Sequence, residues 1–199
     1  LDRLGWIIPH NDGAGVVEAV GAGVDRGRVG QRVWTYGATG SRSTGTCAES
    51  TLLPAEQAVP LPDAADFAAG ACMGIPAMTA HFGVFGGGSV RSKTLLVHGG
   101  AGGVGYYAVQ WAAWGRATVI ATVSSPEKEA LARAAGAHHV ITYTAQDVAA
   151  RVRQLTDGAG VDRVVDVAFG RNLRVNIDSL APGGSIASYG SDAEREPVF

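Results

Sequence analysis

A glycine-rich stretch in the middle of the chain has the composition and spacing of a phosphate-binding turn. From Gly100 the order is Gly-Ala-Gly-Gly-Val-Gly, so Gly100, Gly102 and Gly105 occupy the glycine positions of a G-x-G-x-x-G fingerprint. In such a turn the first glycine makes a tight bend, the second lets backbone approach a pyrophosphate, and the third lets helix pack on strand. The sequence therefore predicts cofactor contacts at five consecutive residues: Gly100, Ala101, Gly102, Gly103 and Val104.

The residues on either side of this turn supply the elements that would position it. Residues 94–98 are an apolar, β-branched run typical of a buried strand, and residues 104–114 favour a helix. A helix N-terminus carries unpaired N–H groups and the positive end of a dipole, and it therefore binds anions. The motif follows a predicted strand and begins a predicted helix. This context makes it stronger evidence for dinucleotide binding than its glycine spacing alone. His98 is expected to be a hydrogen-bonded, partly buried side chain rather than an acid or base.

The end of the second strand decides between NADH and NADPH. A site for NAD usually carries Asp or Glu about 20 residues beyond the fingerprint, where it holds the ribose 2′-hydroxyl. This chain has Ser124 and Ser125 at that strand end and Lys128 shortly after. Hydroxyl donors and an ammonium group suit a 2′-phosphate, so the set predicts NADPH. Two alternatives stay open, because Ser125 could cap the following helix and Lys128 could be a solvated charge.

Strands and helices alternate after Pro62, which is typical of a parallel α/β sheet. We expect strands at 94–98, 117–123, 139–143, 162–167 and 185–189, and helices near 104–114, 126–135, 145–156 and 172–180. Ser125, Pro126 and Gly136 are start and stop signals for the second of these helices. Earlier in the chain the pattern predicts short strands within 13–21, 31–36 and 47–53, followed by a helix over 63–85.

Composition and charge narrow the class of protein. The 199 residues are 46% hydrophobic and 17% charged with a formal net charge of −2, so we expect no nucleic-acid or membrane partner. No apolar stretch reaches the roughly 18 residues that a membrane-spanning helix needs. Cys47 and Cys72 form no disulfide framework, which favours a cytoplasmic location.

Four segments in collinear order resemble the quinone oxidoreductases related to zeta-crystallin, in the medium-chain dehydrogenase/reductase superfamily. These segments are 12–21, 98–105, 119–128 and 183–190. The resemblance implies a Rossmann domain with a doubly wound parallel sheet, joined to part of a GroES-like β-barrel domain. The boundaries it implies are 1–78 for the partial GroES-like catalytic domain with its connecting helix, and 79–199 for the Rossmann domain.

Relative to that family the chain lacks an amino-terminal segment and a carboxy-terminal segment. The second of these includes the last strand of the Rossmann sheet. We therefore expect a chain that is truncated at both ends, with an unpaired sheet edge near Phe199.

Further site residues follow from the resemblance. Tyr143, at the end of the third strand, stands where the family places a residue against the adenosine phosphate. Segments 166–170 and 188–191 stand where the family lines the nicotinamide, although ordinary turn sequence after buried strands is the alternative. The resemblance thus adds to the cofactor-binding set Ser188, Tyr189, Gly190, Ser191 and Thr79. We assign no catalytic residue.

Zinc ligands of the related alcohol dehydrogenases are missing from the matching positions. Asn11 replaces the histidine that precedes the acidic residue, with His10 one place earlier, and Ile75 replaces a cysteine ligand. Cys72, three residues away, is expected to be a buried small side chain. His138 and His139 are neighbours on a strand and point to opposite faces, so they cannot share an ion. We expect no metal.

The resemblance implies NADPH-dependent hydride transfer to a quinone or a similar conjugated carbonyl without zinc. Such an acceptor suits a site without an acid/base pair, because its product anion is already delocalised. Two alternatives remain: a non-catalytic NADPH-binding fragment or regulatory protein, and an enoyl or alkenal reductase. The expected partner is a small molecule, and a homodimer stays open.

Overall fold

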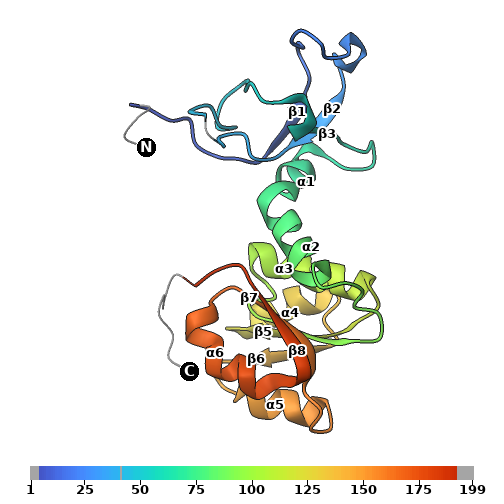
Figure 1. The fold of residues 1–199 in the computed structure, drawn as a ribbon, viewed down its shortest axis with the longest axis vertical. Helices are drawn as coiled ribbons and strands as arrows, with labels where there is room; N and C mark the ends of the chain where they lie inside the picture. The colour runs from blue at the N-terminus through green and yellow to red at the C-terminus, as the bar shows by residue number, and fades with distance from the viewer. Residues whose placement is uncertain (1–4, 41, 192–199) are drawn as a thin grey trace. The chain divides into compact units, whose positions relative to one another are not determined.

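The second half of the chain folds into the parallel sheet that the alternation of elements predicts (Figure 1). Its strands are β4 (Thr94–Val97), β5 (Thr118–Val123), β6 (His139–Thr142), β7 (Val161–Asp166) and β8 (Leu180–Ser188). The spatial order β6-β5-β4-β7-β8 corresponds to the order 3-2-1-4-5 of the doubly wound dinucleotide-binding fold. The order reverses at β4, and in such folds ligands bind at the carboxyl ends of the strands beside that point.

The structure is a computed structural model that describes residues 5–40 and 42–191. The chain divides into two compact units, Leu1–Met78 and Thr79–Phe199. The expectation of an unpaired sheet edge near Phe199 concerns residues outside the described ranges.

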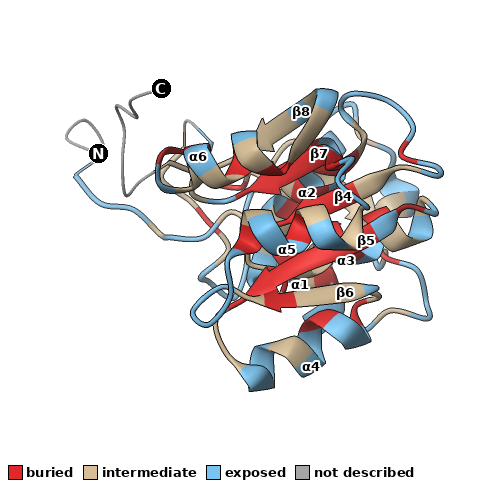
Figure 2. Cartoon of the chain, turned by 90° about the horizontal axis from the view of Figure 1, so that it is seen from below, coloured by how far each residue is buried: buried red, intermediate tan, exposed pale blue. Residues whose placement is uncertain are grey.

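Helices cover both faces of the sheet because its strands are apolar on both sides. The helices of this unit are α2 (Met78–Phe85), α3 (Gly103–Trp114), α4 (Pro126–Ala134), α5 (Val148–Leu155) and α6 (Phe169–Ser179). Successive strand residues point to opposite faces, so Val97 packs with α2, α3 and α4 while Leu96 packs with α5. In Figure 2, β5 and β7 are mainly buried, whereas β6 and β8 are mainly intermediate or exposed.

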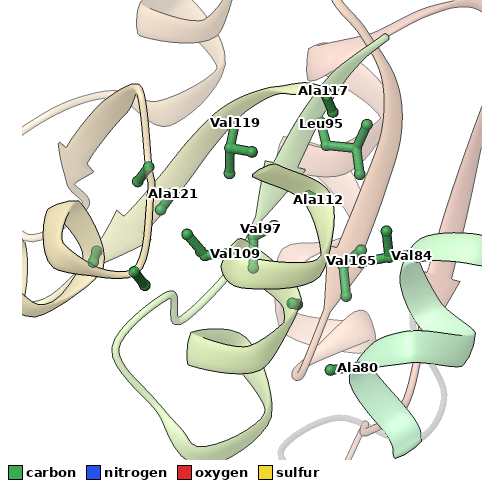
Figure 3. Packing of buried hydrophobic residues seen from close by; sticks show 14 of the residues in the cluster. Ala80, Val84, Leu95, Val97, Val109, Ala112, Ala117, Val119, Ala121 and Val165 are labelled. Atoms are coloured by element: carbon green, nitrogen blue, oxygen red, sulfur yellow. The ribbon is translucent and has the colours of Figure 1, made fainter. Parts of the chain in front are cut away.

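The two faces of the sheet are filled by different side chains. The face under α2, α3 and α4 is rich in alanine, with Val109 and Ala112 of α3 in one cluster with Val119 and Ala121 of β5 (Figure 3). The face under α5 contains no alanine among its buried members, which are Leu96, Ile120, Ile141, Val148, Val152, Val161 and Val164. Small side chains leave room for α3 to lie close to the sheet.

Three element boundaries differ from the expectation by three residues or more. Helix α5 begins at Val148, because the Asp147 carboxylate caps it by accepting from the Ala150 amide at 3.0 Å. Helix α6 begins at Phe169 instead of 172. Strand β8 begins at Leu180 instead of 185, with a register shift opposite Val161–Arg163. Gly183 has φ of +77° inside β8, and such weak strand formers conceal a strand from pattern analysis.

The first unit contains a small antiparallel sheet. Its elements are β1 (Gly13–Val16), η1 (Arg26–Arg28), β2 (Arg32–Thr35), η2 (Ala55–Gln57) and β3 (Ala58–Pro60), with strand order β1-β2-β3. The strand expected over 47–53 is wrong. The Thr46 and Cys47 amides donate to the carbonyls of His10 and Pro9, each at 3.1 Å, so they join a loop instead of a ladder.

The helix expected over 63–85 is interrupted. It consists of α1 (Phe67–Ala71), a π-helical segment η3 (Met73–Ala77), and α2. Gly74 has ψ of −109° at the break, and the Asp12 carboxylate there accepts from the Ile75 amide at 2.7 Å. A Cβ at Gly74 would lie 2.1 Å from Asp12 Oδ1. The carboxylate thus takes a backbone donor that an uninterrupted helix would use, and Pro76 supplies none.

Candidate functional site

The glycine-rich turn after β4 leaves helix amides open at its far end. Gly102 precedes the first residue of α3 and its amide bonds back to the Gly99 carbonyl at 2.8 Å. The amides of Gly103, Val104 and Gly105 lie in the first turn of α3 and have no acceptor among the described residues. A Cβ at Gly103 would meet nothing within 4 Å. Three N–H groups at the positive end of a helix are therefore unpaired among the described residues, and the space beside Gly103 is open.

The other glycines of the turn are required by packing. A Cβ at Gly100 would lie 2.7 Å from the Cβ of Ala121, and one at Gly105 would lie 2.1 Å from the Gly99 carbonyl oxygen. The left-handed conformation of the turn is at Gly99, with φ of +65°, and not at Gly100, where the fingerprint puts the tight bend. Gly100 is instead a close-approach position between the turn and β5.

Ser124 and Lys128 meet beyond the end of β5, the strand beside β4. The Lys128 ammonium donates to Ser124 Oγ at 3.0 Å, and both groups are accessible to solvent. Ser125 precedes α4 but its side chain forms no capping hydrogen bond, so its capping alternative is not what the structure shows. Pro126 is the first residue of α4, and Gly136, just past its end, has φ of +108°, as expected.

A carboxylate lies close to this pair. The Ser125 hydroxyl hydrogen-bonds to Glu127 and lowers the pKa of that fully exposed carboxyl. Tyr143 is 49% exposed, and its amide bonds to the Val123 carbonyl at 3.0 Å, so it lies at the same strand end. The structure thus brings Ser124, Ser125, Lys128 and Tyr143 together, and it adds a negative charge that opposes a bound phosphate.

The segments after β7 and β8 are joined to each other by hydrogen bonds. Tyr189 donates its amide to the Asp166 carbonyl at 3.0 Å, Phe169 donates to the Gly190 carbonyl at 2.9 Å, and Gly170 donates to Ser191 Oγ at 3.0 Å. Ser188 Oγ donates to the Gly190 carbonyl at 3.2 Å. Gly99 reaches this assembly too, because a Cβ there would lie 3.7 Å from Val167 Cγ1.

Thr79 does not join the other candidate residues. It lies in the first turn of α2, and that helix packs on the sheet through the neighbouring Ala80 and Val84 (Figure 3). No described contact connects Thr79 with the strand-end turns.

A buried polar network beneath the turns is the main feature that pattern analysis missed. His98 Nε2 lies 2.8 Å from Asn176 Oδ1, and Thr122 Oγ1 lies 3.3 Å from His98 Nδ1. Asn176 Nδ2 donates to Asp166 Oδ2 at 2.6 Å, and Asn172 Nδ2 donates to Asp166 Oδ1 at 2.8 Å. The expectation of a hydrogen-bonded His98 is confirmed, although it is only 5% exposed. The sequence signal for this network was the pair Asn172 and Asn176, which lie four residues apart and therefore on one face of α6.

Burial lowers the pKa of His98 below its usual 6.5, against the opposing effects of the Asp166 charge and the Asn176 hydrogen bond. The unfolded chain therefore binds a proton near pH 6.5 that the folded chain binds only at lower pH. Hence the free energy of unfolding should fall as pH drops from 6.5 toward the folded pKa. Urea unfolding of the protein and of His98→Asn at about pH 7.5 and about pH 5.5 measures this, and equal pH dependence in both would contradict it.

Possible metal ligands in the described ranges do not converge. Among residues 5–40 and 42–191, no three His, Cys, Asp or Glu side chains are placed to hold one ion. Cys72 is exposed at the end of α1, so the expectation that it is buried is wrong. Asp12 is engaged by the Ile75 amide, and burial raises the pKa of its carboxyl.

Both halves of the chain match known domain families. Residues 3–63 match the alcohol dehydrogenase GroES-like domain, and residues 103–199 match the zinc-binding dehydrogenase family. No helix in the described ranges has the length and apolar character to span a bilayer.

Similar proteins include a quinone oxidoreductase of Pseudomonas aeruginosa, 41% identical over 91% of this chain and 55% of its own length. A 2-haloacrylate reductase of a Burkholderia species is 38% identical over 92% of this chain and 55% of its own. The crystal structure of Escherichia coli quinone oxidoreductase complexed with NADPH has a TM-score of 0.82 and 29% identity, over 96% of this chain and 57% of that one. The chain thus spans about half the length of its relatives.

The order of the two domain families agrees with the architecture, since a GroES-like portion precedes a parallel sheet with a glycine-rich turn after its first strand. On these grounds the chain belongs to the medium-chain dehydrogenase/reductase superfamily.

Proposed function

We propose that this protein is an NADPH-dependent oxidoreductase that transfers hydride to a quinone or a similar conjugated carbonyl without zinc. One observation carries the proposal: helix amides without an acceptor at Gly103, Val104 and Gly105 follow β4, and the Ser124–Lys128 pair follows the adjacent strand β5. The names of the quinone oxidoreductases among the relatives support it.

The residues present fit a dinucleotide. The open amides of α3 can donate to a pyrophosphate, and the empty space at Gly103 lets its oxygens approach the backbone. Lys128 and Ser124 can donate to a 2′-phosphate at the end of β5. When bound, the cofactor supplies the hydride. The protein would contribute the turns after β7 and β8, which include Ser188, Tyr189, Gly190 and Ser191, as the support for the nicotinamide.

Proton supply in this proposal comes from water or a bound hydroxyl. Burial, followed by the nearby Asp166 charge, raises the pKa of Tyr189 to about 12. That phenol therefore keeps its proton at neutral pH. Asn11 and Ile75 stand at two of the positions where zinc ligands are required, which supports a reaction without zinc.

Lys128→Ala is expected to weaken NADPH binding about tenfold, because it removes one charge-assisted hydrogen bond to the 2′-phosphate. NADH lacks this phosphate, so its affinity should not change. The matched variant is Glu127→Gln, one residue away, which removes the opposing charge and should strengthen NADPH binding alone. Titration of cofactor fluorescence with each variant measures both effects, and equal losses for the two cofactors in Lys128→Ala would exclude the phosphate role.

Turnover separates the proposed enzyme from its rivals. Loss of NADPH absorbance with a simple benzoquinone supports quinone reduction, whereas tight NADPH binding without turnover of any acceptor indicates a non-catalytic binding protein. Preference for 2-haloacrylates or enones over quinones would favour the enoyl or alkenal reductase alternative, which the Burkholderia relative suggests.

Two further expectations accompany this function. Cys47 and Cys72 are both free thiols, which supports a cytoplasmic location. A homodimer stays a proposal, and sedimentation at several protein concentrations would test it.

A further inference from the structure

We propose that His98 is a positioning residue that couples the Asp166 carboxylate, at the end of β7, to the Gly99 amide in the phosphate-binding turn. The coupling runs through a chain of hydrogen bonds whose directions are all determined. This inference rests on the proposed function, since the turn is taken to hold the NADPH pyrophosphate and the β7 and β8 turns to hold its nicotinamide.

The direction of the chain is set at Asp166, which has no exposed surface. Its Oδ1 accepts from the backbone amide of Ala168 at 2.9 Å and from Asn172 Nδ2 at 2.8 Å, and its Oδ2 accepts from Asn176 Nδ2 at 2.6 Å. Because the carboxylate accepts on both oxygens, Asn176 must present its NH2 group to it. The carbonyl oxygen of that amide therefore faces away, toward His98.

His98 can satisfy this carbonyl in one tautomer alone. Asn176 Oδ1 is an acceptor, so His98 Nε2, at 2.8 Å, must carry the proton. Burial keeps the pKa of the ring low, so the imidazole stays neutral and Nδ1 is an acceptor. Thr122 Oγ1, at 3.3 Å, must then donate to Nδ1.

The last link reaches the turn. Because the Thr122 hydroxyl hydrogen points at His98, its oxygen is free to accept the Gly99 amide, which lies 3.2 Å away. Gly99 is the left-handed residue of the turn, and the next amide, Gly100, bonds to the Thr122 carbonyl at 2.9 Å. At the other end of the chain, the Asp166 carbonyl accepts the Tyr189 amide. The network thus connects the ends of β4, β5, β7 and β8.

Asp166→Asn tests the coupling, because it should reverse the direction of each hydrogen bond between residue 166 and His98. The introduced amide keeps its oxygen toward the Ala168 amide and turns its NH2 group toward Asn176, which must rotate to accept. Asn176 then offers NH2 to His98 Nε2, and the ring must move its proton to Nδ1. The readout is the 15N spectrum of the histidine rings in the cofactor-free full chain, with the His98 signals assigned from His98→Asn.

We expect Nε2–H in the unchanged protein and Nδ1–H in Asp166→Asn, together with a roughly tenfold weaker NADPH affinity. The matched control is Asp162→Asn. Asp162 lies at the opposite end of β7, and its carboxylate likewise accepts a backbone amide, that of Thr94 at 2.7 Å. This variant should leave the His98 tautomer and NADPH affinity unchanged.

The possible results distinguish failure of the His98 coupling from failure of the proposed NADPH-dependent function. An unchanged tautomer in Asp166→Asn overturns the coupling even if NADPH binds. A changed tautomer with unchanged NADPH affinity overturns the positioning role. Failure of the unchanged protein to bind NADPH overturns the proposed function, and the positioning role with it, whatever the ring spectra show.

If Asp166→Asn does not fold, Thr122→Val cuts the chain at its last link. Removing the hydroxyl should speed hydrogen exchange of the Gly99 amide at least about tenfold while His98 keeps its proton on Nε2. Thr118→Val, on the exposed first residue of β5, is the control. Equal exchange rates at Gly99 in the two valine variants would overturn the coupling.

Discussion

Gly105→Ala is expected to remove measurable NADPH binding, with an affinity loss of at least about 100-fold. The new Cβ would lie 2.1 Å from the Gly99 carbonyl oxygen and 3.2 Å from Gly100 Cα, so the turn must move away from α3. Moving it misplaces several amides that would donate to the pyrophosphate, and each such bond to a charged group contributes about 1.5–3 kcal/mol. We also expect the free energy of unfolding to fall by about 3 kcal/mol, because the Cβ would collide with backbone atoms, which cannot rotate away as a side chain can.

Gly103→Ala is the matched variant for this prediction, because a Cβ there meets nothing within 4 Å. Its free energy of unfolding should stay within about 0.5 kcal/mol of the unchanged protein. Any loss of NADPH affinity in Gly103→Ala then reports on the open side of the turn rather than on its folding. Isothermal titration with NADPH and urea unfolding provide the two measurements. Normal binding by Gly105→Ala would refute the assigned pyrophosphate site.

Asn176→Ala is expected to lower the free energy of unfolding by about 4 kcal/mol. Asn176 is fully buried, and its removal leaves two buried groups without their partner: His98 Nε2–H and Asp166 Oδ2. An unsatisfied buried polar group costs about 1–3 kcal/mol, and more where it is charged. Urea unfolding with an unchanged slope is the appropriate measurement.

Asn172→Ala gives the comparison on the same helix and the same carboxylate. Asn172 is only partly buried, and Asp166 Oδ1 keeps the Ala168 amide after the change. The expected loss is about 1 kcal/mol. If the two alanine variants were equally stable, the network would not depend on the bridging position of Asn176.

The strand, turn and helix around the fingerprint could be predicted because each depends on neighbours in sequence. The apolar run of β4, the glycine spacing, and Pro126 and Gly136 at the ends of α4 are local signals, and the structure reproduces them with boundary shifts of one residue. The glycine spacing does not show which glycine of the turn has the left-handed conformation. Gly99 and Gly100 are adjacent glycines, and only the closeness of Ala121 shows that the second must pack rather than bend.

Features that depend on distant residues could not be predicted from the pattern. His98 and Asn176 are separated by 78 positions, and their contact exists only because the fold places the residue after β4 beside α6. Similarly, the break before α2 requires Asp12, which is 63 positions from Ile75. A run of small and apolar residues over 63–85 contains no sign of that carboxylate.

The two faces of the parallel sheet differ in the size of their buried side chains, and we expect them to tolerate different kinds of substitution. Under α2, α3 and α4 half of the buried side chains are alanines, and harm at those positions comes from added volume, which strains a well-packed core. Under α5 the branched side chains can be shortened, so harm there comes from cavities. Evolutionary drift should therefore rarely enlarge the alanines on the face that carries α3, whereas the opposite face can exchange Leu, Ile and Val for one another at low cost.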